Sequence, residues 1–469
     1  MNMVKPLDLM FIGLESASRP LHMAGFEIFE LPARYRGDYI TDLVEAFRQG
    51  DIGAPFNKVI TGLERGIPRW AEQEPDLRYH VRHLAVPSPG RMDQLYELIS
   101  FVNAPILDRS RPLWECYVIE GVEQNRFAIL FKVHHALIDG LGGMKLFEKS
   151  LNTRANSREF KTVWQPHEPR KHKAGSKQRV PSFAQLVPGI QKTASKLLDT
   201  SRELASFRPQ NMLMPFSATR STLNSPTLSN ERRFAACDLS LPLIKRLGKA
   251  TGTTVNDVVM AAIDLGLQRY LEEQDATIDE PLRVMMPMSL AHRGKGKGGN
   301  QVSVLLTELG KPGQKPLECL QSIHDSNDRI KQEAAKVPPG ALQLYTMLLA
   351  GGAVATEAVP GLDRTPTNNL LISNMPGPRG KLYLAGAPLI GFYGLPIVPP
   401  GSGLNITFLS CGDAICLAVG ANPDAVDSPF TLTGYISDAL DDLAREIEGG
   451  NKPKRKRKKA PARRSRSNK

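Results

Sequence analysis

The apolar residues in the first third of the chain follow two different periods. Short apolar or alternating runs predict strands at residues 24–31, 113–121 and 126–135, and the last two runs are joined by a turn near Gly121. Helical spacing predicts helices at residues 39–50, 92–105 and 141–152, and the first of these ends in a glycine. This part of the chain therefore mixes strands with helices.

The last half of the chain has the same mixed character. Strands are predicted at residues 232–241, 281–290, 300–309, 369–378, 381–396 and 403–423, and helices at 242–252, 254–274, 317–336 and 430–449. Thr254 or Asn256 is the expected N-cap of the second helix, with Asp257 in its first turn, where the helix dipole favours an acid. Residues 337–356 are apolar and uncharged, but prolines and a glycine pair favour a buried or interfacial helix over a membrane span.

A polar, basic, proline-bearing segment separates the two halves. We therefore predict an α/β protein with mixed sheets in two domains, since 469 residues exceed the usual size of one core. The predicted divisions are an N-terminal domain (1–156), a linker with a crossover helix (157–226), a C-terminal domain (227–450) and a basic disordered tail (451–469).

The positive charge of the chain is concentrated in that tail. Its 11 Lys and Arg residues account for nearly all of the formal net charge of +12, which leaves a body close to neutral. The body therefore gives no reason to expect nucleic-acid binding. The tail fits a solvated extension, attachment to an anionic lipid surface, or contact with nucleic acid.

Cysteine usage and the N-terminus favour a reducing, cytoplasmic compartment. The five cysteines are scattered without a CxxC pair, so free and mostly buried thiols are expected. Asp8 and Glu15 interrupt the first apolar segment, which argues against a signal peptide. A GxGxxG match at 294–299 is followed by a strand-like rather than a helical pattern, which argues against dinucleotide binding.

The segment LFKVHHALIDGLGG (130–143) carries the candidate chemistry. His134 and His135 are adjacent at a strand end, so alternation points them to opposite faces, and no partner segment supports a zinc site. They could simply cap the strand. A histidine that faces a cleft is instead suited to act as a general base, and glycines after it allow tight turning. Because GxSxG is absent, such a base would activate a substrate hydroxyl directly.

The pattern HHxxxDG at 134–140 resembles that of the CoA-dependent acyltransferase superfamily. Within it the chain is similar to the bacterial wax ester synthase/diacylglycerol acyltransferase family over about residues 5 to 445. The supporting segments are LDLMFIGLESASRPLHMAG, DRSRPLWECYVIEG, TVNDVVMAA, PMSLAHRGKGKGGNQVS, LLISNMPGP and GSGLNITFLSCGD, in the family's order. Met375 stands where we expect valine, and SCGD lacks the aromatic residue that often follows the serine. The basic tail lies outside the resemblance.

The resemblance implies two chloramphenicol-acetyltransferase-like domains with an active-site channel between them. His135 would be the general base that takes the proton from a diacylglycerol or fatty alcohol hydroxyl, and acyl-CoA would be the donor substrate. His134 would be the auxiliary histidine, and Asp139 would hold the loop through an arginine. No cofactor and no metal are implied.

Further roles follow from the resemblance only. Asn256 and Asp257 match a pair associated with activity, although their position also suits a helix start. Thr407, Ser410 or a backbone amide near Gly140 could stabilise the oxyanion. Peripheral association with the inner membrane face or with lipid inclusions is expected. The alternatives are a related acyltransferase with another acceptor or a carrier-bound donor, and a non-catalytic protein of the lipid-droplet surface.

Overall fold

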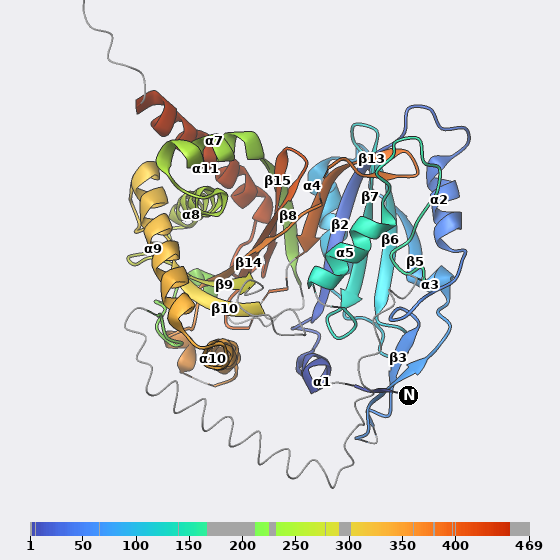
Figure 1. Cartoon of the computed structure of the whole chain (residues 1–469), viewed down its shortest axis with the longest axis horizontal. Coiled ribbons are helices and arrows are strands. Elements are labelled where there is room, and N and C mark those ends of the chain that lie inside the picture. The colour runs from blue at the N-terminus through green and yellow to red at the C-terminus, as the bar shows by residue number, and fades with distance from the viewer. Residues whose placement is uncertain are drawn as a thin grey trace, which may run out of the picture.

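The computed structural model contains two six-stranded mixed sheets that lie side by side with helices around them (Figure 1). It describes residues 2–4, 6–64, 66–138, 140–166, 212–224, 231–276, 278–289, 302–359, 361–378, 380–395, 397–398 and 400–450. The predicted crossover helix, the GxGxxG match, Asp139 and the basic tail lie outside these ranges.

The first sheet is built mainly from the N-terminal third of the chain. Its strands have the order β12 (Tyr383–Leu384), β13 (Ala387–Leu395), β2 (His22–Glu30), β7 (Arg126–His134), β6 (Trp114–Val122) and β5 (Val81–Ala85). Every neighbouring pair is antiparallel except β5 and β6. The helices of this half are α1 (Pro6–Leu14), α2 (Tyr39–Phe47), α3 (Leu77–His80), α4 (Met92–Asn103) and α5 (Gly140–Ser150).

A small antiparallel sheet extends the lower edge of this half in Figure 1. It comprises β1 (Asn2–Met3), β4 (Arg69–Glu72) and β3 (Lys58–Thr61). These strands, α3 and β5 have no more than five residues each, too few to show a period, and they were not predicted; α1 was not predicted either.

The second sheet lies against the long helices of the C-terminal half. Its strands have the order β10 (Val302–Glu308), β9 (Arg283–Ser289), β11 (Leu370–Met375), β14 (Leu404–Cys411), β15 (Ala414–Ala421) and β8 (Arg233–Ser240). The helices are α7 (Leu241–Thr251), α8 (Val255–Glu273), α9 (Pro316–Lys336), α10 (Pro339–Ala358) and α11 (Pro429–Gly450), and two short 3-10 helices cover Thr222–Asn224 and Leu362–Arg364. All the longer helices and strands that the hydrophobic pattern predicts here are present.

Strand β13 crosses the predicted division into domains. It lies within the predicted C-terminal domain, 227–450, but pairs along its length with β2 of the first sheet, from Leu395 beside Ala24 to Leu389 beside Phe29. In Figure 1 it stands as an orange strand among the blue and cyan strands of the N-terminal half. The predicted boundaries therefore do not separate the two sheets, because each strand run was assigned to the domain of its sequence neighbours.

The cysteines and the apolar stretch meet their predictions. All five cysteines are free thiols, and four of them are buried. The 337–356 stretch forms most of α10, which buries Leu342, Tyr345 and Leu349 and leaves Met347 58% exposed. In the part of the chain that the structure describes, no helix has the length and apolar character needed to cross a bilayer.

Candidate active site

His135 lies directly after β7, at the end of the first sheet that faces α1. Its backbone amide donates a hydrogen bond to the Leu21 carbonyl at 3.2 Å. Its ring stacks on Phe11 of α1, with ring centroids 4.5 Å apart and planes 18° from parallel. The backbone and the ring of His135 are therefore both held by the N-terminal segment.

A cavity of about 360 Å³ lies between the two sheets and includes His135 in its wall. The other lining residues of the first half are Phe11, Leu21, Met23, Ala24, Gly25, Phe131, Val133, Ile138, Gly143, Met144, Phe147 and Val163. Those between residues 371 and 407 are Leu371, Ser373, Met375, Phe392, Gly394, Leu395, Ile397, Pro400, Asn405 and Thr407. Most of these side chains are apolar, so the cavity suits a long hydrocarbon chain better than a charged ligand.

Three polar side chains of the second sheet face the same cavity. Asn405 and Thr407 are alternate residues of β14 and so lie on one face of the sheet, and Ser373 of β11 is the parallel neighbour of Thr407. The Oδ1 atom of Asn405 is buried without a hydrogen-bond partner in the described residues. Donors and acceptors from the second half thus share a cavity with a histidine from the first.

Ser410, the other predicted oxyanion donor, is not in the cavity wall. It is three residues from Thr407, so strand alternation points the two side chains to opposite faces of β14. Phe408, on the face of Ser410, packs in the core beneath the helices, whereas Leu409, on the face of Thr407, packs in the core of the first sheet. The prediction for Ser410 is therefore wrong on geometric grounds.

His134 points away from the cavity into a buried polar cluster. Its Nε2 atom lies 3.5 Å from Oε1 of Glu15, and its Nδ1 accepts a hydrogen bond from the Ala136 amide at 3.0 Å. Glu15 also accepts from Arg109 at 3.2 Å and from the Leu21 amide at 3.1 Å. Since Leu21 accepts from the His135 amide, the cluster fixes the backbone on which His135 stands.

The charge of Glu15 is set by these partners. Burial raises the pKa of the carboxyl, but the hydrogen bond and charge of His134, together with the hydrogen bonds from Leu21 and Arg109, outweigh it and bring the pKa to about 2. Glu15 is therefore ionised across the whole physiological range. The opposite directions predicted for the two histidines are confirmed, with His135 at the cavity and His134 in the cluster.

The first turn of α5 reaches the cavity. Gly140 begins this helix, and Gly143 and Met144 belong to the cavity wall. A helix N-terminus carries partial positive charge, which favours a nearby negative oxygen. The structure thus keeps open the predicted contribution of a backbone amide near Gly140, while Asp139 lies outside the described residues.

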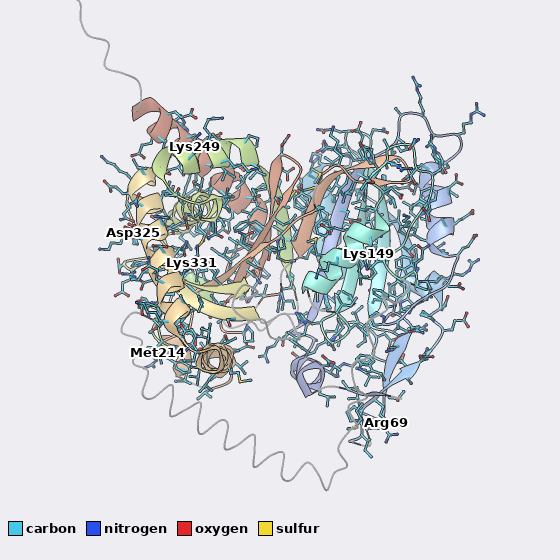
Figure 2. All side chains as sticks on the ribbon, in the orientation of Figure 1. Arg69, Lys149, Met214, Lys249, Asp325 and Lys331 are labelled. Carbon is cyan, nitrogen blue, oxygen red and sulfur yellow. The ribbon has the colours of Figure 1, made fainter. Side chains whose placement is uncertain are left out.

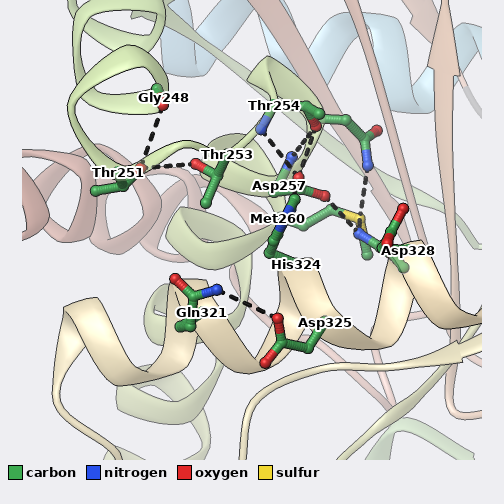
Figure 3. Close-up of polar contacts among 12 residues, drawn as sticks. Gly248, Thr251, Thr253, Thr254, Asp257, Met260, Gln321, His324, Asp325 and Asp328 are labelled. Carbon is green, nitrogen blue, oxygen red and sulfur yellow. Dashed lines mark hydrogen bonds and ion pairs between the residues drawn. The ribbon is translucent and has the colours of Figure 1, made fainter.

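Asn256 and Asp257 are brought close to each other but not to the cavity wall. Thr254 is the N-cap of α8, its hydroxyl accepts from the Asp257 amide at 3.2 Å, and Asp257 accepts in return from the Thr254 amide at 3.0 Å. The Asp257 carboxylate also accepts from His324 of α9 at 2.8 Å (Figure 3) and from Asn327 of the same helix at 2.8 Å. Asp257 therefore joins two helices, and a substrate-positioning role for it has no contact to support it.

The surroundings of Asp257 and Asn256 determine the pKa of the first and the strand contact of the second. Burial raises the pKa of Asp257, but the hydrogen bonds from Asn327, His324 and Thr254 outweigh it, so the pKa lies below its usual range. Asn256 accepts a hydrogen bond from the Asn374 amide group at 3.2 Å, and Asn374 follows Ser373 of the cavity. Asn256 thus touches the strand that carries a cavity residue.

Several site residues were missed by the sequence analysis. Ser373 and Asn405 interrupt apolar strands with a polar side chain, and that interruption was the available signal. Phe11 had no signal, because an aromatic residue on a short helix is ordinarily part of a core. In the described ranges, no three His, Cys, Asp or Glu side chains come together in a way that could hold a metal ion.

Comparisons with known proteins agree with this arrangement. The wax ester synthase/diacylglycerol acyltransferase catalytic domain matches residues 4–259, and the C-terminal domain of the same family matches residues 298–444. The chain is 40% identical to Tgs4 of Mycobacterium tuberculosis, named as a diacylglycerol O-acyltransferase, over 98% of this chain and 100% of Tgs4. It is 34% identical to Tgs2 of the same organism, over 95% of this chain and 100% of Tgs2.

Solved structures give the same result. The wax ester synthase/diacylglycerol acyltransferase of Marinobacter aquaeolei VT8 superposes with a TM-score of 0.78 at 29% identity, over 96% of this chain and 100% of that one. The starter condensation domain of rhizomide synthetase shares the fold, with a TM-score of 0.55 at 14% identity over 95% of this chain and 94% of that one. The two-domain α/β fold and the matched domains together show that the chain belongs to the wax ester synthase/diacylglycerol acyltransferase family.

Proposed function

We propose that the protein transfers a long-chain acyl group from acyl-CoA to the hydroxyl of diacylglycerol or of a long-chain alcohol. The observation that carries this proposal is the apolar cavity that holds His135 from one half and Thr407 from the other. The names of Tgs4 and of the Marinobacter enzyme, a diacylglycerol O-acyltransferase and a wax ester synthase/diacylglycerol acyltransferase, support acyl transfer to the same acceptors. Acyl-CoA and the acceptor are substrates, and the reaction needs no further group.

His135 acts as the general base in this proposal. It removes the proton of the acceptor hydroxyl as the oxygen attacks the thioester carbonyl. The carbon–sulfur bond then breaks, and the proton passes from His135 to the leaving thiolate of CoA. The negative oxygen that forms at the carbonyl carbon is stabilised by the Thr407 hydroxyl and by the N-terminal turn of α5. His134 and Glu15 position His135 without contacting substrate.

The decisive assay follows thiol release from palmitoyl-CoA, with dioleoylglycerol or hexadecanol as acceptor. His135→Ala should lower the rate by at least about a thousandfold, because both proton transfers lose their carrier. Thermal unfolding should stay close to that of the unmutated protein, since His135 lies at the cavity wall. Undiminished turnover by this variant would exclude His135 as the base.

Thr407 and Ser410 form a matched pair for the oxyanion. Thr407→Val should lower kcat by about a hundredfold, because one donor to the developing charge is lost while the shape is kept. Ser410→Ala should leave kcat within about twofold. Equal losses in the two variants would remove Thr407 from the mechanism.

We also propose that the protein works at a lipid surface, since its acceptors dissolve in lipid. Figure 2 labels Met214 near α10 and Arg69 of β4 along its lower edge, and Met214 is 48% exposed. Met347 of α10 and Ile67, beside β4, are 58% and 53% exposed. Phe11, on α1 at the same edge, also lines the cavity, so an acceptor would have a short path from lipid to His135.

The lipid-surface proposal is tested by vesicle flotation. A double variant with Met347→Asp and Ile67→Asp should lose most of its binding to phosphatidylcholine vesicles that contain diacylglycerol. Phe101→Asp is the control, because Phe101 is 78% exposed but lies on α4. If the control loses as much binding as the double variant, the lower edge is not the contact.

A further inference from the structure

A second, much smaller cavity lies behind the wall of the active-site cavity. It has a volume of about 10 Å³, and Phe131, Phe147 and Val163 belong to the walls of both cavities. Three apolar side chains therefore separate the two spaces. Gly25 lies beside this wall, because a Cβ atom built on it would be in van der Waals contact with the Phe147 ring at 3.7 Å.

The small cavity has two polar oxygens with nothing to bind. Glu27 and Thr162 both line it, and they are 3% and 2% exposed. Glu27 Oε1 and Thr162 Oγ1 have no hydrogen-bond partner in the described part of the chain. Two further polar side chains line the cavity, but Ser150 donates to the Phe147 carbonyl at 2.8 Å and Lys161 pairs with Glu159 at 3.4 Å. The rest of the wall is apolar, with Phe47, Ile129, Leu151, Trp164 and Leu384 among its residues. Buried polar atoms are normally paired, so this pair requires an explanation.

The carboxyl of Glu27 is suited to an apolar site. Burial raises its pKa to about 8, with a smaller contribution from the Cys411 thiol. It is therefore mostly neutral at neutral pH and can both donate and accept a hydrogen bond. A neutral carboxyl and a hydroxyl in the wall of one small cavity provide hydrogen-bonding partners for a small polar group.

The position of Glu27 along the sheet sets the length of acyl chain that would extend from His135 to it. Gly25 and Glu27 are alternate residues of β2 and lie beside Phe131 and Ile129 of β7. Ile129 is six residues before His135, which corresponds to about 20 Å along a strand. Carbon–carbon bonds of about 1.5 Å advance somewhat less than their length in an extended chain, so this distance corresponds to roughly 16 carbons.

We propose that Glu27 and Thr162 form the far end of the acyl site, where they favour an acyl chain that carries a hydroxyl at its end over an alkyl chain of the same length. The inference rests on the proposed acyl transfer and assigns it a substrate preference. An alkyl end that moves between Phe131 and Phe147 leaves both oxygens unpaired. A terminal hydroxyl can pair with both of them, and sites built to bind a hydroxyl strongly reject analogues that lack it.

The test compares three donors with dioleoylglycerol as the acceptor: decanoyl-CoA, hexadecanoyl-CoA and 16-hydroxyhexadecanoyl-CoA. Decanoyl chains are too short to reach Glu27, so decanoyl-CoA reports acyl transfer without any contribution from Glu27. In the unmutated protein kcat/KM for the hydroxylated C16 donor should exceed that for the alkyl C16 donor by about tenfold. Glu27→Leu should reverse this ratio, and Glu27→Gln should retain part of it.

Glu30→Leu is the control, because Glu30 is an exposed glutamate on the same strand. It should keep the ratio of the unmutated protein. If a water molecule pairs with both oxygens whichever donor is bound, the two C16 donors should have equal kcat/KM. A ratio of one in the unmutated protein would therefore overturn the inference without any variant. An unchanged ratio in Glu27→Leu overturns it as well. Failure to transfer even the decanoyl group would instead count against the proposed function.

Discussion

Two buried glutamates of the first half have opposite charge states, although both are almost fully enclosed. Glu15, beside the active-site backbone, has a pKa of about 2, and Glu27, in the wall of the small cavity, has a pKa of about 8. Burial acts in the same direction on both, so their partners decide the outcome. Glu15 has His134, Arg109 and the Leu21 amide, whereas Glu27 Oε1 has no partner in the described ranges.

The difference in charge state matches two different roles: Glu15 positions the active-site backbone, and Glu27 is proposed to select the substrate. A carboxylate that is ionised and fully paired holds a structure in one place, and Glu15 holds the segment on which His135 rests. A neutral and unpaired carboxyl contributes nothing to rigidity but can recognise a ligand. Unlike roles for two buried acids can thus be inferred from their hydrogen bonds and not from their exposure.

The largest expected effect on stability comes from removing a partner of Glu15, so that this carboxyl, like that of Glu27 in the described ranges, lacks a partner. His134→Ala removes one of the polar partners of the buried Glu15 carboxylate and leaves a space, which should lower the free energy of unfolding by about 3 to 5 kcal/mol. Chemical denaturation at pH 7 measures it. A loss below about 1 kcal/mol would show that Arg109 and the Leu21 amide are sufficient for Glu15.

The pH dependence of stability should have opposite signs at the two glutamates. Glu27 keeps its proton in the folded state up to about pH 8 but loses it near pH 4.5 when unfolded, so its contribution makes stability fall as pH rises between these values. Glu27→Gln should therefore be roughly 2 to 4 kcal/mol more stable than the unmutated protein at pH 8 and close to it at pH 4.5. Denaturation midpoints across this range give the measurement.

The opposite slope is expected at Glu15. Its folded pKa of about 2 lies below its unfolded value, so its contribution is complete above about pH 4.5 and disappears as pH falls towards 2. Glu15→Gln should flatten the acid side of the stability profile. Parallel profiles for the two glutamine variants would contradict the assigned charge states.

Activity should respond to Glu15 but not through substrate binding. Glu15→Gln should lower kcat by about a hundredfold with little change in KM for acyl-CoA, because the base loses its alignment and the cavity keeps its walls. Glu27→Gln should leave the decanoyl-CoA rate within about twofold. A KM effect in Glu15→Gln that accounts for the whole loss would indicate a role in binding instead.

Asp257 provides a third buried carboxylate that is paired but away from the cavity. Asp257→Asn should lower the free energy of unfolding by about 1 to 2 kcal/mol, because the hydrogen bonds with His324 and the Thr254 amide weaken. The rate per folded molecule should stay within about twofold. A large loss of rate at unchanged stability would return Asp257 to the active site.

The sequence predicts helices and strands better than it predicts which strands pair with one another. The strand at 387–395 is evident from its apolar run, but nothing in that run states that β2 is its partner, since pairing over more than 350 residues depends on the tertiary fold. Short elements such as β3, β4 and α3 lack enough residues to show a period.

The same contrast holds for the site. His135 could be predicted from its motif, and the error at Ser410 was avoidable by counting three residues along a strand from Thr407. Glu27 could not be predicted, because in AGFEIFEL it alternates with apolar residues as an exposed strand position would. Only the covering by Phe147 and Trp164 reveals that it is buried.

The pairing of β13 with β2 has a consequence for synthesis of the protein. When the N-terminal third leaves the ribosome, β2 has its β7 neighbour but lacks the strand at 387–395, so one edge of the first sheet stays unpaired through most of translation. Open edges with apolar residues such as Phe26 and Ile28 invite association with other chains. Residues 1–166 produced alone should therefore aggregate, and co-expression with residues 212–450 should restore a soluble pair.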